Sequence, residues 1–211
     1  WRILTTSENS AYIMSDIALD FFSMQPNRKS EIRDDLLASY NNSPGVPDGI
    51  YANNWEYSFI RSWLNETFYN EVFNDLQKEI IQTTHLDNSA RSCNPNEYPK
   101  YYGYGENAGK NKYADQCKDT DDKIFLLSLR DVTTTAYGFN KDVNAEDPAR
   151  NLQASDFAKF HGVSMGNTQK DYVTWYTRSP SLAVGNQGYT TFVLYRDNKG
   201  VINSPNLVAE G

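Results

Sequence analysis

The sequence predicts an α+β fold with an antiparallel sheet, and two observations lead to this prediction. The clearest helical periodicity lies in the first half of the chain, whereas strand-like stretches dominate the second half. Strands and helices do not alternate regularly, as a doubly wound parallel sheet would require. The 211 residues suit a single domain, 1–211, and an aromatic content of 14% can supply its core.

The chain opens with a pattern typical of two strands joined by a polar turn. In "WRILTTSENSAYIMSD" the turn is expected at Ser7–Ser10. Ile3, Tyr12 and Met14 are expected to face inward. Apolar and polar residues alternate on either side of the turn, which is the period of a half-buried strand.

Helices are predicted next. "SEIRDDLLASY" at 30–40 has an apolar stripe behind a Ser cap, and 41–50 consists of turn residues. The strongest signal is 54–73, where large apolar residues recur at three- and four-residue spacing after Asn54. A further helix is expected from Asn74, which has Gln77 at the capping-box position.

The remainder predicts one helix and several strands. "DDKIFLLSL" at 121–129 fits a strand buried on both faces. A short helix is expected from Ser155 to Gly162, since the first is a good N-cap and the second a good residue after the end. A strand is expected at 172–180, and two strands joined by a "DNKG" turn at 189–203.

Charge and hydropathy exclude several classes of partner. The net charge is −7 and no basic run occurs, so nucleic acid and an anionic membrane surface are not expected partners. No apolar run approaches the roughly 20 residues that span a bilayer, so no membrane insertion is expected. The sequence begins with Trp1, and we expect it to be part of a longer protein whose other modules are partners.

The two cysteines of the chain, Cys93 and Cys117, enclose a segment rich in Gly, Asn and Lys. We expect a disulfide between them, which implies an extracytoplasmic setting, and two free thiols are the alternative. In the loop-entropy account such a bond contributes roughly 3 kcal/mol. With only two histidines in the chain, a structural zinc site is poorly supported.

The segment between the cysteines carries the candidate binding residues. Tyrosine joins a large apolar face to a hydroxyl and loses little entropy on binding, so it suits sugars and peptides. The alternative is that these tyrosines pack back on the domain. The candidate ligand contacts are Tyr98, Tyr101, Tyr102, Tyr104, Asn107 and Lys110.

No catalytic motif stands out, and no cofactor is expected. GxSxG and SxxK are absent, and His85 and His161 are interpreted as residues near helix ends. Asp119, Asp121 and Asp122 are interpreted as a solvated entrance to a strand, with calcium as the alternative. A hydrolase with paired carboxylates stays open because such pairs cannot be seen in one sequence.

Three blocks occur in the order of a known pattern: "WEYSFIRSWLNETFYNEVF" (55–73), "DKIFLLSLRDV" (122–132) and "WYTRSP" (175–180). With the opening "WRIL", they resemble an uncharacterised domain of bacterial secreted and surface proteins. Its pattern is roughly W-E-x-S-x-[IL]-R-x-W-L-N, D-K-[IV]-F-L-L-S, W-W-L-R-S-P and G-V-R-P-A-L. The last block is not matched, and 93–117 resembles an insertion.

The resemblance implies a C-type lectin-like fold and offers no catalytic residues. It implies a non-catalytic module of an extracellular or cell-surface protein that recognises a glycan or a surface protein. A structural or assembly domain is the first alternative, and a glycan-active hydrolase the second. The residues expected to be structural are Trp55, Arg61, Trp63, Trp175 and Arg178, and a buried arginine should have an acid or carbonyls beside it.

Overall fold

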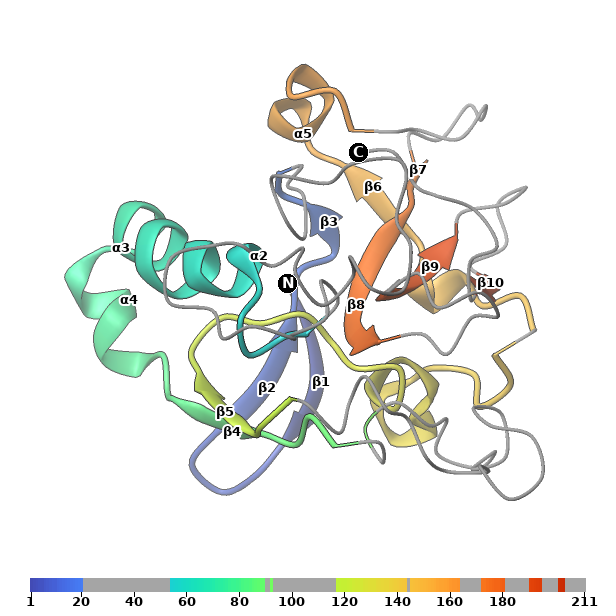
Figure 1. Cartoon of the computed structure of the whole chain (residues 1–211), viewed down its shortest axis with the longest axis horizontal. Helices are drawn as coiled ribbons and strands as arrows, with labels where there is room; N and C mark the ends of the chain where they lie inside the picture. Colours follow the sequence, from blue (N-terminus) through green and yellow to red (C-terminus); the bar gives the residue numbers. More distant parts are fainter. Residues whose placement is uncertain are drawn as a thin grey trace, which may run out of the picture.

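The computed structural model describes residues 1–20, 54–89, 92, 117–143, 145–163 and 172–180, together with the backbone of 190–194 and 201–203. These residues form a mixed α+β fold with short helices and mainly antiparallel strands (Figure 1). The predicted α+β class is confirmed. The helix predicted at 30–40 and the loop at 41–50 lie outside the described residues.

The opening hairpin consists of β1 (Arg2–Thr6) and β2 (Ala11–Met14), closed by a hydrogen bond from the Ser7 amide to the Ser10 carbonyl. The predicted hairpin and turn are confirmed. Ile3, however, is 62% exposed and lies opposite Ile13, while Leu4 is buried, so the inward position predicted for Ile3 is wrong. Two adjacent apolar residues fit either phase of a two-residue period, and a register shift next to Ile3 accompanies the inward placement of Leu4.

One helical rod follows, made of α2 (Phe59–Ser62), a π-helical stretch η1 (Trp63–Phe68) and α3 (Tyr69–Val72). The helix begins after Ser58, whose hydroxyl accepts the Arg61 amide. Asn54, the expected cap, instead accepts the Tyr57 amide in the preceding turn. No helix in the described part of the chain is both long and apolar enough to cross a membrane.

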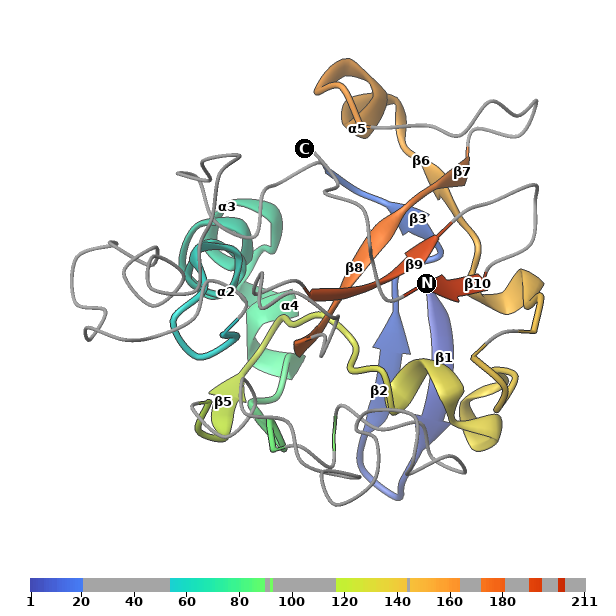
Figure 2. The ribbon, with the colours of Figure 1, turned by 45° about the vertical axis from the view of Figure 1, so that its right-hand side comes forward.

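The last helix of this group is α4 (Asp75–Ile80), and its start is the predicted one. The Asn74 side chain accepts the Gln77 amide, and the Gln77 side chain accepts the Asn74 amide, so the capping box is confirmed. Figures 1 and 2 both show α2, α3 and α4 gathered on one side of the molecule.

A two-stranded sheet lies under these helices, formed by β4 (Thr84–Leu86) and β5 (Thr120–Asp122). The strand predicted over 121–129 is therefore mostly wrong, because regular pairing ends at Asp122. Beyond that point side chains supply hydrogen bonds that a neighbouring strand would otherwise supply, as where the Ser179 hydroxyl accepts the Leu129 amide. The chain continues through η4 (Asp131–Thr133) and η5 (Thr135–Tyr137).

A second region contains the 3-10 turn η6 (Pro148–Arg150) and a sheet in which β3 (Ile17–Ala18) runs parallel to β6 (Leu152–Ala154) and β7 (Tyr172–Val173) antiparallel to it. Helix α5 (Asp156–Phe160) follows β6. The Ser155 hydroxyl accepts the Ala158 amide, and Gly162 has a φ of 86°, so both predicted ends are confirmed.

The C-terminal strands form one antiparallel sheet in the order β10 (Val201–Asn203), β9 (Thr190–Leu194), β8 (Trp175–Pro180). The two strands predicted over 189–203 are confirmed, while their "DNKG" turn lies outside the described residues. The strand predicted over 172–180 divides between two sheets, because β7 pairs with β6 and β8 pairs with β9.

Two apolar clusters lie inside this framework. The larger includes Leu129, Val132, Val143 and Val173, and the smaller is built around Trp55. Trp175 packs against the first cluster, whereas Trp63 packs against the second. Each cluster is hydrogen-bonded to a buried charged side chain, the larger to Arg150 and the smaller to Asp122.

Arg150 is the charged group of the larger cluster, and it is fully buried. Its guanidinium donates to the carbonyl oxygens of Val132, Asn140, Asp142 and Ala145. Its Nε also lies 3.4 Å from a carboxylate oxygen of Asp147. Asn140, Asp142 and Ala145 thus direct their carbonyl groups onto the Arg150 guanidinium, which satisfies these buried acceptors.

Candidate functional site

The predicted ligand contacts lie outside the described residues. This applies to Tyr98, Tyr101, Tyr102, Tyr104, Asn107 and Lys110, and to Cys93. The structure does describe both ends of that segment, at Ser92 and Cys117. The described residues around these two ends form the base of the segment, which we define as residues 54–58, 86–89, 92 and 117–123.

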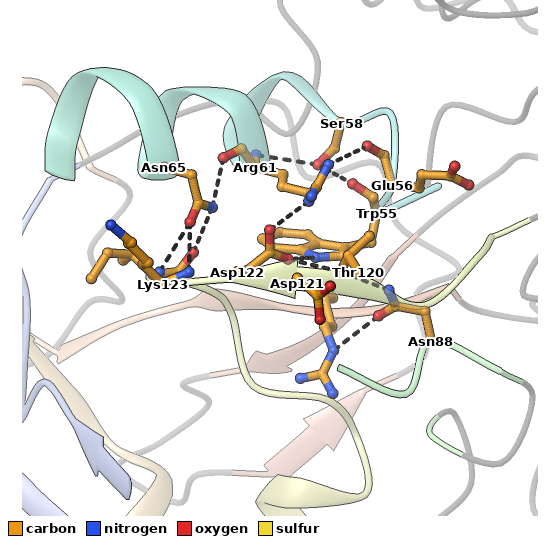
Figure 3. Close-up of polar contacts among 12 residues, drawn as sticks. Trp55, Glu56, Ser58, Arg61, Asn65, Asn88, Thr120, Asp121, Asp122 and Lys123 are labelled. Atoms are coloured by element: carbon orange, nitrogen blue, oxygen red, sulfur yellow. Dashed lines mark hydrogen bonds and ion pairs between the residues drawn. The ribbon is translucent and has the colours of Figure 1, made fainter. Parts of the chain in front are cut away.

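A buried carboxylate stands at the centre of this base. Asp122 is 1% exposed, and one of its oxygens accepts a hydrogen bond from Arg61 Nε at 2.8 Å. The other oxygen accepts from Trp55 Nε1 at 3.0 Å and from the Thr120 hydroxyl at 2.8 Å. Figure 3 shows these groups converging between helix α2 and strand β5. A desolvated carboxylate is costly unless it is paired and hydrogen-bonded, and here both conditions hold.

The network continues from Thr120 to the third sequence block. The amide of Asn88 donates to the Thr120 hydroxyl at 3.0 Å, and its oxygen accepts from Arg178 Nε at 3.2 Å. Arg178 also binds the Asp131 carboxylate and the Leu126 carbonyl. Side chains from all three blocks are therefore linked in one continuous chain of hydrogen bonds.

Asn65 attaches the helical rod to the same strand. Its amide group donates to the Ile124 carbonyl at 2.9 Å, and its oxygen accepts the backbone amides of Lys123 and Ile124. Asn65 lies in the π-helical stretch η1, whose wider turn is a rare geometry that often occurs at functional sites. The side chain substitutes for a neighbouring strand at the point where β5 ends.

Both ends of the segment are held by hydrogen bonds to other parts of the described chain. At one end the Ser92 carbonyl accepts from the Arg130 amide and from the Ser179 hydroxyl. At the other end the Cys117 sulfur accepts the Glu56 amide at 3.4 Å, and the Glu56 carboxylate accepts the Lys118 amide at 3.0 Å.

The predicted disulfide is not borne out by the structure. Cys117 is a free thiol, half-buried beside Glu56, and Cys93 lies outside the described residues. Burial is the largest cause that raises the pKa of the Cys117 thiol to about 11. At neutral pH the group is therefore a protonated thiol with little nucleophilic character.

Chemically, the base is suited to holding structure rather than to proton transfer. The Asp122 carboxylate binds three donors and has almost no contact with solvent, so it is not placed to meet a substrate. In the part of the chain that the structure describes, no group of three or more His, Cys, Asp or Glu side chains is arranged to hold a metal ion.

Sequence reasoning missed the central role of Asp122, since it interpreted all three acids of "DTDD" as solvated. That interpretation is wrong for Asp122, while Asp119 and Asp121 are exposed beside His85. His85 lies in β4, not at a helix end. His161 does end a helix, and its Nδ1 lies 2.7 Å from Asp20. The available signal was the expectation of an acid beside Arg61.

Replacing Asp122 by Asn should destabilise the protein by about 3–5 kcal/mol, because an amide cannot accept hydrogen bonds at both positions and leaves Arg61 without its counter-charge. Urea denaturation followed by tryptophan fluorescence measures the change. Asp121→Asn is the matched control: the neighbouring side chain is 69% exposed, and its loss should cost about 1 kcal/mol or less. Equal losses in the two variants would contradict the buried-hub assignment.

The Cys117 thiol should react slowly with iodoacetamide. A pKa of about 11, against 9.0 for an unperturbed thiol, lowers the thiolate fraction about 100-fold near neutral pH. The rate is measured in a Cys93→Ser variant, folded and in denaturant, so that only Cys117 reports. Similar rates in both conditions would refute burial. Free thiols are counted separately in denatured wild-type protein without reductant. Two free thiols agree with the structure, whereas a count of zero would show that the disulfide forms.

No curated protein and no solved structure gives a significant match. The family described as "Domain of unknown function (DUF6273)" matches residues 9–210, which is nearly the whole chain and includes all three blocks joined by the network. The chain is therefore a member of the DUF6273 domain family.

Proposed function

We propose that this chain is a non-catalytic ligand-binding module of a bacterial extracellular or cell-surface protein. Its scaffold would be C-type lectin-like, and its ligand a glycan or a surface protein. The observation that carries the proposal is the fixing of Ser92 and Cys117, the two ends of the tyrosine-rich segment, by hydrogen bonds to Arg130, Ser179 and Glu56. These three partners are the sequence neighbours of Asp131, Arg178 and Trp55 in the buried network. Binding residues are often carried on connecting segments that a rigid scaffold positions.

The composition of the segment supports the same proposal. Its five tyrosines lie among glycines and asparagines, which is a mixture of large flat contact groups and adaptable polar ones. A sugar ring would stack on the phenol faces and exchange hydrogen bonds with Asn107 and Lys110. The Asp122 carboxylate at the centre of the base is fully engaged by three donors, which is consistent with recognition without turnover.

A structural or assembly domain is the second candidate, and exposed apolar side chains favour it. Val72, Leu76 and Ile80 are exposed along α3 and α4, and Phe160 on α5 is 85% exposed. Exposed apolar groups that gather on one element often mark contacts with another protein. In this alternative the chain would hold neighbouring modules of a surface protein together.

The first test is a glycan array probed with the purified domain, with calcium and with EDTA. A Tyr101→Ala/Tyr102→Ala variant should lose at least about tenfold in affinity for any glycan bound, because each stacked ring contributes on the order of 1 kcal/mol. Phe160→Ala is the matched control, since it removes an exposed ring on α5 and should leave the affinity unchanged.

Two results would contradict the proposal. Unchanged binding by the double tyrosine variant would place the ligand elsewhere on the domain. A blank array with folded protein, together with self-association or partner binding that Phe160→Ala or Leu76→Ser abolishes, would favour the assembly function. Comparison of the arrays with calcium and with EDTA separately shows whether glycan binding requires calcium.

A further inference from the structure

The outer face of the β4–β5 sheet carries a cluster of three titratable groups. His85 lies directly opposite Asp121 in the antiparallel register, and its Nδ1 is 2.8 Å from an oxygen of Asp121. Its Nε2 is 3.6 Å from an oxygen of Asp119. Both nitrogens of one ring therefore lie near carboxylates, one on β5 and one on the residue just before it.

Strand periodicity separates this cluster from the buried hub. Side chains two residues apart share a face, so Thr120 and Asp122 point into the buried network while Asp119 and Asp121 lie on the opposite side. Strand β5 and the residue before it thus have two different faces. One face is held by buried hydrogen bonds, and the other carries exposed titratable groups. The other oxygen of Asp119 accepts a hydrogen bond from the backbone amide of Asn88 at 2.9 Å. This bond links the exposed cluster to the chain just after β4.

We propose that His85, Asp119 and Asp121 form a pH-sensitive clasp that tightens the β4–β5 pair when the imidazole is protonated. An imidazolium donates from both ring nitrogens, whereas a neutral imidazole donates from only one. The protonated ring can therefore bind both carboxylates at once, and the neutral ring must release one of them. The clasp joins β4 to β5 and to Asp119 just before it, and we call residues 84–86 and 119–122 the neck.

The direction of the effect follows from linkage. The hydrogen bond to Asp121 is the largest cause that raises the pKa of His85 above its ordinary value of 6.5, and the charges of Asp121 and Asp119 add to it. A pKa raised by the paired state means that this stabilisation is fully present below about pH 6.5. It is lost as the pH rises through the higher pKa of the paired ring.

Other charges around the ring do not alter this sign. Among the described residues, the charged groups within ion-pair distance of His85 are Asp119 and Asp121, which lie on β5 or just before it. Asp87, the next acid beyond β4, uses a carboxylate oxygen to accept the Ser89 amide. The inference concerns the β4–β5 pair itself and does not depend on the proposed ligand.

The test combines an NMR titration of the histidine rings with hydrogen exchange of the β4 and β5 amides, from about pH 5.5 to about pH 8.5, above the range in which ordinary carboxylates take up protons. Exchange is expressed as protection relative to the unfolded chain, and the β6–β7 amides serve as the internal reference. For each unit by which the His85 pKa exceeds 6.5, neck protection should fall tenfold across the titration.

Variants separate the clasp from a general effect of charge. His85→Asn should abolish the pH dependence of neck protection, and Asp121→Asn should move the His85 pKa back toward 6.5. His161→Asn, which removes the other histidine of the chain, should leave both readouts unchanged. The proposal is overturned if His85 titrates like an unpaired histidine, if neck protection is independent of pH, or if His161→Asn has the same effect as His85→Asn.

Discussion

The buried carboxylate of Asp122 is the constraint on which the arrangement of α2, β4 and β5 depends. Burying a carboxylate costs free energy unless hydrogen-bond donors replace its water. Arg61, Trp55 and Thr120 are the donors to Asp122. Each donor comes from a defined place in the sequence, so satisfying one carboxylate also fixes where α2 stands relative to β5. The apolar cluster around Trp55 packs in the geometry that this choice sets.

A similar solution appears in the other half of the molecule with the charges reversed. Arg150 is surrounded mainly by backbone carbonyls, and an irregular stretch closes around it. Short strands and 3-10 turns leave many backbone groups without the partners that long sheets provide. Side chains meet this need in both regions, Arg150 in one and Asn65 and Ser179 in the other. This explains why so little regular secondary structure suffices.

Local chemistry was predictable from the sequence, whereas long-range partners were not. The caps at Asn74 and Ser155 were foreseen because cap and amide lie within three residues of each other. The strand predicted over 121–129 failed because Asn65 and Ser179, distant in sequence, provide its partners. Asp122 was misread for the same reason: burial depends on residues about 60 positions away.

The central claim is that the three sequence blocks form one cooperative unit around Asp122, and a double-mutant cycle tests it most directly. Arg61→Met and Arg178→Met are combined, because Arg61 binds Asp122 itself and Arg178 reaches it only through Asn88 and Thr120. The unfolding free energies should be non-additive by about 0.5–3 kcal/mol. Additivity within about 0.5 kcal/mol would show two independent sites and contradict the account.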